Sequence, residues 1–87
     1  MIEFKKHVEG ILCAEIAIMI EQQGYFLETE FCNIVCEKYN FRISTVRPVL
    51  RRIYPELQLI RRRLSNELKD FYGLDVKGCP IIYLKKC

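Results

Sequence analysis

The most informative part of the sequence is the segment 43–53, which reads ISTVRPVLRRI. Ser44 is a common helix-capping residue, and aliphatic residues and arginines alternate after it. In a helix over residues 44–54, the aliphatic side chains fall within about a third of the circumference and face inward. The outer face then has Pro48 and Arg51 at its centre and Arg47 and Arg52 on its flanks. We therefore predict an amphipathic helix whose outer face is rich in arginine.

The net charge of +3 at pH 7 conceals an uneven distribution along the chain. Residues 1–41 contain three Lys and seven Glu, a balance of −4. Residues 42–87 contain eleven Lys or Arg and four Asp or Glu, a balance of +7. All seven arginines lie between Arg42 and Arg63. An acidic half joined to a basic half indicates binding to a polyanion.

Two further helices and a short strand are predicted before this segment. Residues 3–22 have apolar residues at steps of three and four, so we expect a long core helix. Residues 29–39 are predicted to form a second helix capped by Thr29. Between them, residues 25–27 (YFL) predict a strand of at most three residues. The expected stop residues of the two helices are Gly24 and Asn40.

The segment 56–72 allows two interpretations. Pro55 before it and Gly73 after it favour a helix, which is the preferred interpretation. The residues that keep helical spacing are Leu57, Ile60, Leu64, Leu68 and Phe71. In the competing interpretation a strand starts at Leu57, and alternate residues up to Arg63 share one face. Residues 80–85 predict a terminal strand, with a hairpin turn at residues 76–79 before it.

The order of these elements resembles that of a winged-helix domain. Residues 24–31 (GYFLETEF) are similar to the entry into the second helix of that family, and residues 43–53 resemble its recognition helix. The resemblance is good over residues 4–54. It implies an α+β, mostly helical fold: a winged helix-turn-helix over residues 1–87 as a single domain, with a short terminal β-hairpin or strand. A helix over residues 56–72 departs from the family pattern, in which the recognition helix leads directly into the wing.

The function that we predict is sequence-specific binding of double-stranded DNA, most simply by a transcriptional regulator with helix 44–54 in the major groove. A guanidinium group can meet guanine O6 and N7 together, and hydroxyl groups at a helix N-terminus can meet a phosphate. The candidate nucleic-acid-binding residues are Arg42, Ser44, Thr45, Arg47, Arg51, Arg52, Arg61, Arg62, Arg63 and Lys77. The alternative is a winged-helix adaptor that binds proteins in a larger assembly. Binding of RNA is a third option, which the sequence does not separate from binding of DNA.

Several classes of function are not expected. A chain of 87 residues leaves little length for a pocket, so we predict no enzymatic activity, no cofactor and no small-molecule substrate. The longest apolar run near the N-terminus, residues 16–20, is far shorter than the roughly 20 residues that cross a bilayer. We therefore expect no membrane partner, and because no secretory signal peptide is recognised at the N-terminus we expect an intracellular, cytoplasmic protein. The cysteine-rich composition resembles small regulators of hyperthermophilic archaea and their viruses.

The five cysteines allow several states. Cys32 and Cys36 are four residues apart and could form half of a metal site, but no second close pair follows them, so no metal is predicted. Together with Cys13 they are interpreted as small buried apolar residues. Cys87, the last residue, is a candidate for an intermolecular disulfide in a possible homodimer, for which the first helix is a second candidate contact.

Overall fold

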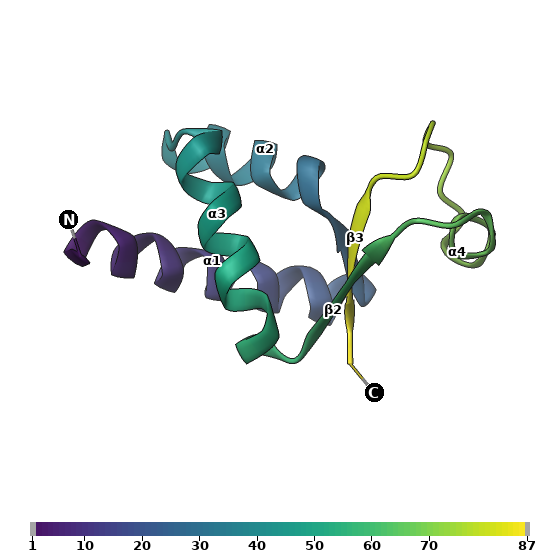
Figure 1. Cartoon of the computed structure of the whole chain (residues 1–87), viewed down its shortest axis with the longest axis horizontal. Helices are drawn as coiled ribbons and strands as arrows, with labels where there is room; N and C mark the ends of the chain where they lie inside the picture. The colour runs from purple at the N-terminus through teal and green to yellow at the C-terminus, as the bar shows by residue number, and fades with distance from the viewer. Residues whose placement is uncertain (1, 87) are drawn as a thin grey trace.

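The computed structural model describes residues 2–86 and shows an α+β fold of 41 × 26 × 19 Å. Within these residues, four α-helices, one 3-10 helix and three strands follow one another (Figure 1). Along the chain they are α1 (Ile2–Gln23), β1 (Tyr25–Leu27), α2 (Glu28–Tyr39), α3 (Ile43–Ile53), η1 (Tyr54–Leu57), β2 (Leu59–Arg63), α4 (Asn66–Tyr72) and β3 (Ile81–Lys85). The elements predicted before residue 54 are found within one residue of their expected bounds.

The three strands form one antiparallel sheet in the order β1-β3-β2. The last strand of the chain therefore lies in the middle of the sheet. Phe26 of β1 and Arg61 of β2 both stand opposite Tyr83 of β3. The terminal strand expected over residues 80–85 is confirmed, and it joins two segments that lie more than thirty residues apart in the sequence.

The predicted N-caps of the second and third helices are both wrong by two positions. α2 begins at Glu28 and α3 at Ile43, so Thr29 and Ser44 lie inside the first turns. The residues before these helices, Leu27 and Arg42, are extended and make no capping hydrogen bond with their side chains. The physical reason is that β1 runs straight into α2, and that the backbone carbonyl of Arg42 already accepts the first helical bonds of α3. The predicted stops at Gly24 and Asn40 are confirmed, because both have left-handed backbone angles, with φ of 81° and 58°.

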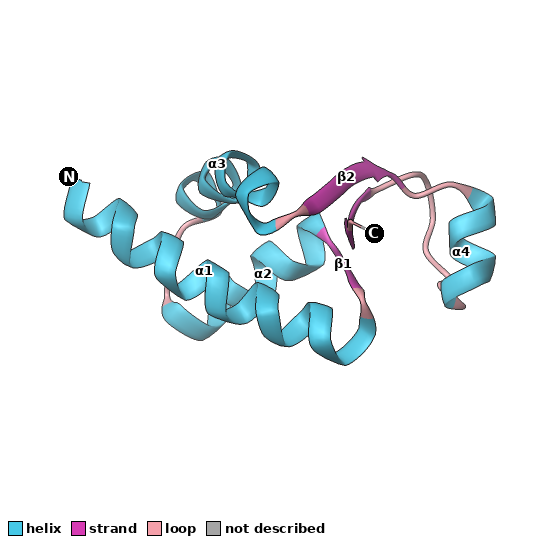
Figure 2. Ribbon diagram, turned by 90° about the horizontal axis from the view of Figure 1, so that it is seen from below, coloured by secondary structure: helices cyan, strands magenta, loops and turns pink. Residues whose placement is uncertain are grey.

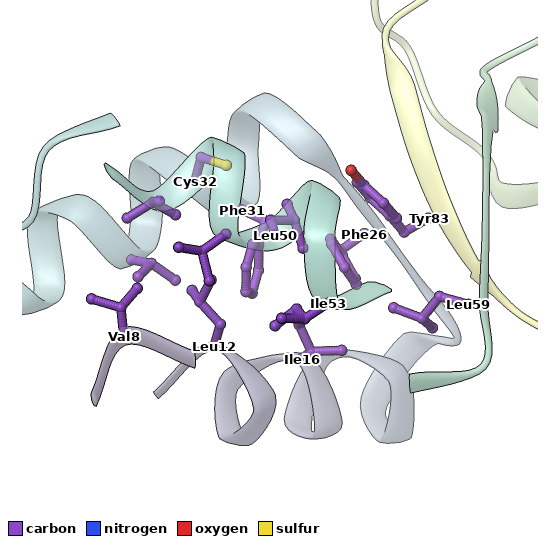
Figure 3. Packing of buried hydrophobic residues seen from close by; sticks show 13 residues of the cluster. Val8, Leu12, Ile16, Phe26, Phe31, Cys32, Leu50, Ile53, Leu59 and Tyr83 are labelled. Carbon is purple, nitrogen blue, oxygen red and sulfur yellow. The ribbon is translucent and has the colours of Figure 1, made fainter. Parts of the chain in front are cut away.

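The main hydrophobic core lies between α1, α2, α3 and one face of the sheet. Figure 3 shows Val8, Leu12 and Ile16 of α1 pointing towards Phe31 and Leu50 of the two shorter helices. Phe26 and Tyr83 extend this core onto the sheet, with their rings stacked at a centroid distance of 4.9 Å. The same core therefore fixes the positions of α1, α3 and the middle strand.

The segment 56–72 is not one helix, and the preferred interpretation of it is wrong. It begins in the 3-10 helix η1, continues as β2 and contains an α-helix only in α4. The residues whose spacing favoured a helix lie in different environments: Leu64 is buried, Ile60 is exposed and Phe71 is 78% exposed. Pairing with β3 decides the outcome, because residues 59–63 all face partners on that central strand.

A second, smaller cluster covers the other face of the sheet. Leu27, Leu64 and Ile82 are its buried members, and Leu68 and Tyr72 of α4 pack against them. Ser65 caps α4 by accepting a hydrogen bond of 3.2 Å from the backbone N–H of Leu68. The connection between β2 and β3 is therefore a folded unit that packs on the sheet rather than an open loop, as Figure 1 shows at the right of the molecule.

The described cysteines, Cys13, Cys32, Cys36 and Cys79, are all free thiols. Cys32 is fully buried, and burial raises the pKa of its thiol to about 11. Cys13 and Cys36 are half-buried and pack against the core, and Cys79 is exposed. In residues 2–86 no three His, Cys, Asp or Glu side chains gather as metal ligands would. The predicted intermolecular disulfide falls on Cys87, which lies outside the described residues.

The longest helix, α1, does not combine the length and the apolar character needed to cross a membrane, nor does any other helix of residues 2–86.

Candidate nucleic-acid interface

The outer face of α3 has the arrangement predicted from the sequence. Its inner residues, Val46, Val49, Leu50 and Ile53, are buried in the main core. Pro48, Arg51 and Arg52 are exposed, and Arg47 is half-buried. Pro48 lies inside the helix and has no N–H for the carbonyl of Ser44. The exposed side of α3 is therefore defined by the chain's own core packing.

Three of the predicted DNA-binding arginines converge on one buried carboxylate, that of Glu28. Nε and Nη2 of Arg51 donate to its Oε1 over 3.1 and 2.9 Å. Nε of Arg47 lies 3.3 Å from Oε1, and Nε of Arg61 lies 3.6 Å from Oε2. The hydroxyl of Tyr83 donates to Oε2 over 3.0 Å. We call these five residues the Glu28 cluster.

The Glu28 cluster is assembled from four elements of the fold. Glu28 is the first residue of α2, where the helix dipole favours a negative charge. Arg47 and Arg51 are one turn apart on α3, whereas Arg61 comes from β2 and Tyr83 from β3. Arg61 and Tyr83 are direct partners across the two strands. The sheet register therefore brings an arginine of β2 to the arginines of α3.

The cluster keeps a surplus of positive charge near the surface. Three guanidinium groups face one carboxylate, which leaves a formal charge of +2. Glu28 is 3% exposed, while the side chains of Arg47 and Arg51 are 37% and 50% exposed. The contacts of Arg47 Nε and Arg61 Nε to the carboxylate are ionic and lack hydrogen-bond geometry. These two Nε atoms are themselves buried, so the N–H groups left for an external anion are those on the solvent-exposed parts of the arginine side chains.

Tyr83 is held in its protonated form. Burial raises the pKa of its phenol well above the ordinary value, and the nearby Glu28 carboxylate raises it further. The phenol therefore stays a hydrogen-bond donor to Glu28 at neutral pH.

The other predicted site residues lie in different places. Arg52 forms an ion pair of 3.0 Å with Glu9 of α1. Arg42, Ser44 and Thr45 are at the start of α3, and the last two line a shallow groove with Lys5. Arg63 is exposed and its guanidinium donates to the carbonyl of Cys79 over 3.4 Å.

Arg62 and Lys77 are not part of the Glu28 cluster. Because side chains alternate along a strand, Arg62 leaves β2 on the face opposite to Arg61. Lys77 is exposed in the connection between α4 and β3. The structure thus brings together Arg47, Arg51 and Arg61, and it separates them from Arg62 and Lys77.

Sequence reasoning missed Glu28, Tyr83 and Glu9. A signal for Glu28 was present: it precedes Cys32 by four residues, so it continues the apolar stripe of α2 towards the N-terminus. An acid in line with buried residues needs a buried partner, and arginine is the common one. Because the sequence predicted that the second helix is capped by Thr29, Glu28 lay outside the predicted helix and outside its apolar stripe.

The sequence matches no protein-family model, no curated protein and no solved structure.

Proposed function

We propose that this chain is a winged-helix protein that binds double-stranded DNA in a sequence-specific manner and acts in transcriptional regulation. The observation that carries the proposal is the arginine-rich outer face of α3, which the Glu28 cluster orients and enlarges with Arg61. An α-helix fits the major groove of B-DNA, and arginine is well suited to reading guanine there.

The topology supports the winged-helix part of the proposal. A helix, a short strand, two helices and two strands follow one another, with the sheet order β1-β3-β2. In this arrangement α3 takes the role of the recognition helix and the connection between β2 and β3 takes the role of the wing. That connection holds α4, so it presents Lys77 from a compact unit, and Arg63 ends the strand that leads into it.

The proposed division of labour follows from the geometry. Arg47 and Arg51 read base edges, because they lie on the exposed side of α3. Arg42, Ser44 and Thr45 at the start of α3 contact a phosphate, with help from backbone N–H groups. Glu28 is a positioning residue, since it limits the orientations of the guanidinium groups without reaching the DNA.

The test is binding to a duplex library and then to the selected duplex over a salt series. Arg47→Ala and Arg51→Ala are expected to weaken binding to the selected site by about 1–3 kcal/mol each. With about six phosphate contacts, the affinity should fall as roughly the fifth power of salt concentration. The matched control is Lys38→Ala, which removes one exposed cation from α2 and should leave selectivity unchanged.

Glu28→Gln separates positioning from charge. The variant keeps every cation and removes one negative charge, so non-specific affinity for DNA should not fall. The affinity for the selected site relative to random DNA is expected to fall about tenfold, because the arginines lose their common anchor. Absent binding to every duplex at low salt would overturn the proposed function and would favour the adaptor alternative.

A further inference from the structure

The outer face of α1 is apolar along most of its length. The helix buries Val8, Leu12 and Ile16, and the residues on the opposite side face the solvent. We define the α1 outer face as the exposed residues His7, Gly10, Ala14, Ala17, Ile18 and Glu21. Surface helices normally place polar residues on this side. An outer face of glycine, alanine and isoleucine therefore indicates a partner that covers it.

The charged residues in the middle of α1 do not interrupt this face. Glu9 points to one flank, where it pairs with Arg52 of α3 over 3.0 Å. Glu15 points to the other flank, where it accepts hydrogen bonds from Lys38 and Tyr39 of α2. Within the described residues, the face carries polar groups only at its ends, with His7 at one end and Glu21 at the other.

The face is complementary to itself. Consider an antiparallel pair of α1 helices with a two-fold axis at Ala14. A residue of one copy then stands opposite the residue of the other copy for which the two residue numbers add up to 28. His7 then meets Glu21 of the other copy, and Gly10 meets Ile18. Ile18 is 46% exposed, and a Cβ placed at Gly10 would find no atom within 4 Å, so there is open space for the isoleucine. Antiparallel helix dipoles also favour this orientation.

We propose that a second copy of this chain packs antiparallel against the α1 outer face, with Ala14 on the two-fold axis. The imidazole of His7 donates to the carboxylate of Glu21, and Lys6 adds a positive charge beside that contact. The small residues at the centre allow the helix axes to approach to about 8 Å. Each copy has an imidazole at one end of the face and a carboxylate at the other, so two identical faces in antiparallel orientation are complementary.

The dimer leaves the arginine-rich side of α3 free. α3 packs on the inner side of α1, and Figure 2 shows α1 below α3. The α1 outer face lies on the side of the helix opposite to Val8, Leu12 and Ile16, which are buried in the core shared with α3. The pairing is therefore independent of DNA binding and is tested without DNA. Contact along one helix buries less than a standard interface, so we expect a micromolar dissociation constant.

The first test is sedimentation equilibrium of the full chain under reducing conditions, from about 1 µM to about 1 mM. The expected result is a reversible monomer–dimer equilibrium. Ala14→Arg places two like charges on the axis and should weaken the dimer at least tenfold, roughly the cost of one desolvated repulsive pair. The control is Asn33→Arg, an equal change at an exposed position of α2, which should leave the dimer unchanged. A chain that is monomeric at every concentration, or a dimer unaffected by Ala14→Arg, would overturn the proposal.

The second test exchanges the charges at the two ends of the face. His7→Glu should weaken the dimer, because it places two carboxylates opposite each other. Glu21→Lys should also weaken it, because it removes the acceptor of His7 and places an ammonium group beside Lys6 of the other copy. The double variant should restore it, because Glu at position 7 then meets Lys at position 21 of the other copy. Both positions are exposed, but the imidazole of His7 also meets the ring of Phe41 edge-on, with the centroids 6.5 Å apart, so urea unfolding of the His7 variants checks that the fold is retained. Absence of restoration would overturn the antiparallel register even if a dimer forms.

Discussion

α1 and α3 share one core but differ in what they expose. Both bury aliphatic residues, with Leu12 of α1 and Leu50 of α3 fully buried in the same cluster. The outer side of α3 carries arginines, whereas that of α1 carries small and aliphatic residues between a histidine and a glutamate. The comparison teaches that the inner faces hold the fold together, while the outer faces carry our two proposals: a polyanion as the partner of α3 and a second copy as the partner of α1.

The arginines of α3 have two kinds of acidic partner. Glu28, which anchors Arg47 and Arg51 of α3, is buried, whereas Glu9 of α1, which pairs with Arg52, is accessible to solvent. A solvent-exposed ion pair contributes little to the free energy of unfolding, because water screens the two charges. A buried carboxylate needs its partners, because it has lost the solvation that water would provide.

The largest expected effect tests whether the inner faces of α1 and α3 contribute equally to the stability of the shared core. Leu12→Ala and Leu50→Ala should each lower the free energy of unfolding by about 2–5 kcal/mol, because each opens a cavity in the shared core. Ile18→Ala on the exposed side of α1 should cost under about 1 kcal/mol in the monomer. Urea denaturation at low protein concentration measures all three. A much smaller loss for one of the two leucines would show that the helices do not share the core equally.

The next effect separates the two acidic anchors. Glu28→Gln should lower the free energy of unfolding by about 1–3 kcal/mol, since three guanidinium groups and a phenol lose a common partner. Glu9→Gln should change it by about 0.5 kcal/mol or less. Thermal and urea unfolding of both variants at pH 7 measure the difference. Equal losses would contradict the distinction between a buried and a solvated anchor.

A smaller effect concerns the pH dependence that Tyr83 adds to the Glu28 cluster. Because the pKa of Tyr83 is raised in the folded chain, the phenol binds its proton more tightly there than in the unfolded chain. Its contribution to stability is complete below the unfolded pKa of about 10 and is lost as pH rises above it. The difference in unfolding free energy between the wild type and Tyr83→Phe should therefore shrink above about pH 10. A difference that stays constant from neutral to alkaline pH would contradict this.

The smallest expected effect on the free energy of unfolding concerns Glu15, on the flank of α1. Lys38 and Tyr39 donate hydrogen bonds that lower the pKa of the Glu15 carboxyl. A lowered folded pKa gives stability that is present above the unfolded pKa and lost as pH falls through the folded one. Glu15→Gln should cost under about 1 kcal/mol at pH 7, and nothing once Glu15 is protonated. Unfolding curves at neutral and strongly acidic pH compare the two conditions.

Local patterns were sufficient for the first four elements, because each pattern agrees with the contacts that the element makes. The predicted structure and the observed one agree in the apolar periodicity of residues 3–22 and 44–54. They also agree in the left-handed helix stops at Gly24 and Asn40. Local patterns failed in residues 56–72, where helical spacing and strand alternation are both present. There the choice depends on β3, which lies some twenty residues further along the chain.

The candidate site was predictable in part for the same reason. The outward position of Arg51 follows from helix geometry and the aliphatic residues beside it. Its contact with Glu28 does not, because it joins residues 23 positions apart on two helices. The convergence of Arg61 and Tyr83 on the same carboxylate depends on the sheet register, which no local pattern determines.

The sequence by itself determined an α+β chain with a short helix that is aliphatic inside and rich in arginine outside. Periodicity and helix stops are local properties, so they can be read from neighbouring residues. Only the tertiary structure decided that β3 lies in the middle of the sheet, that residues 59–63 form a strand, and that one buried glutamate gathers three arginines. Those features join distant segments, and their stability comes from pairing and burial that arise only when the chain is folded.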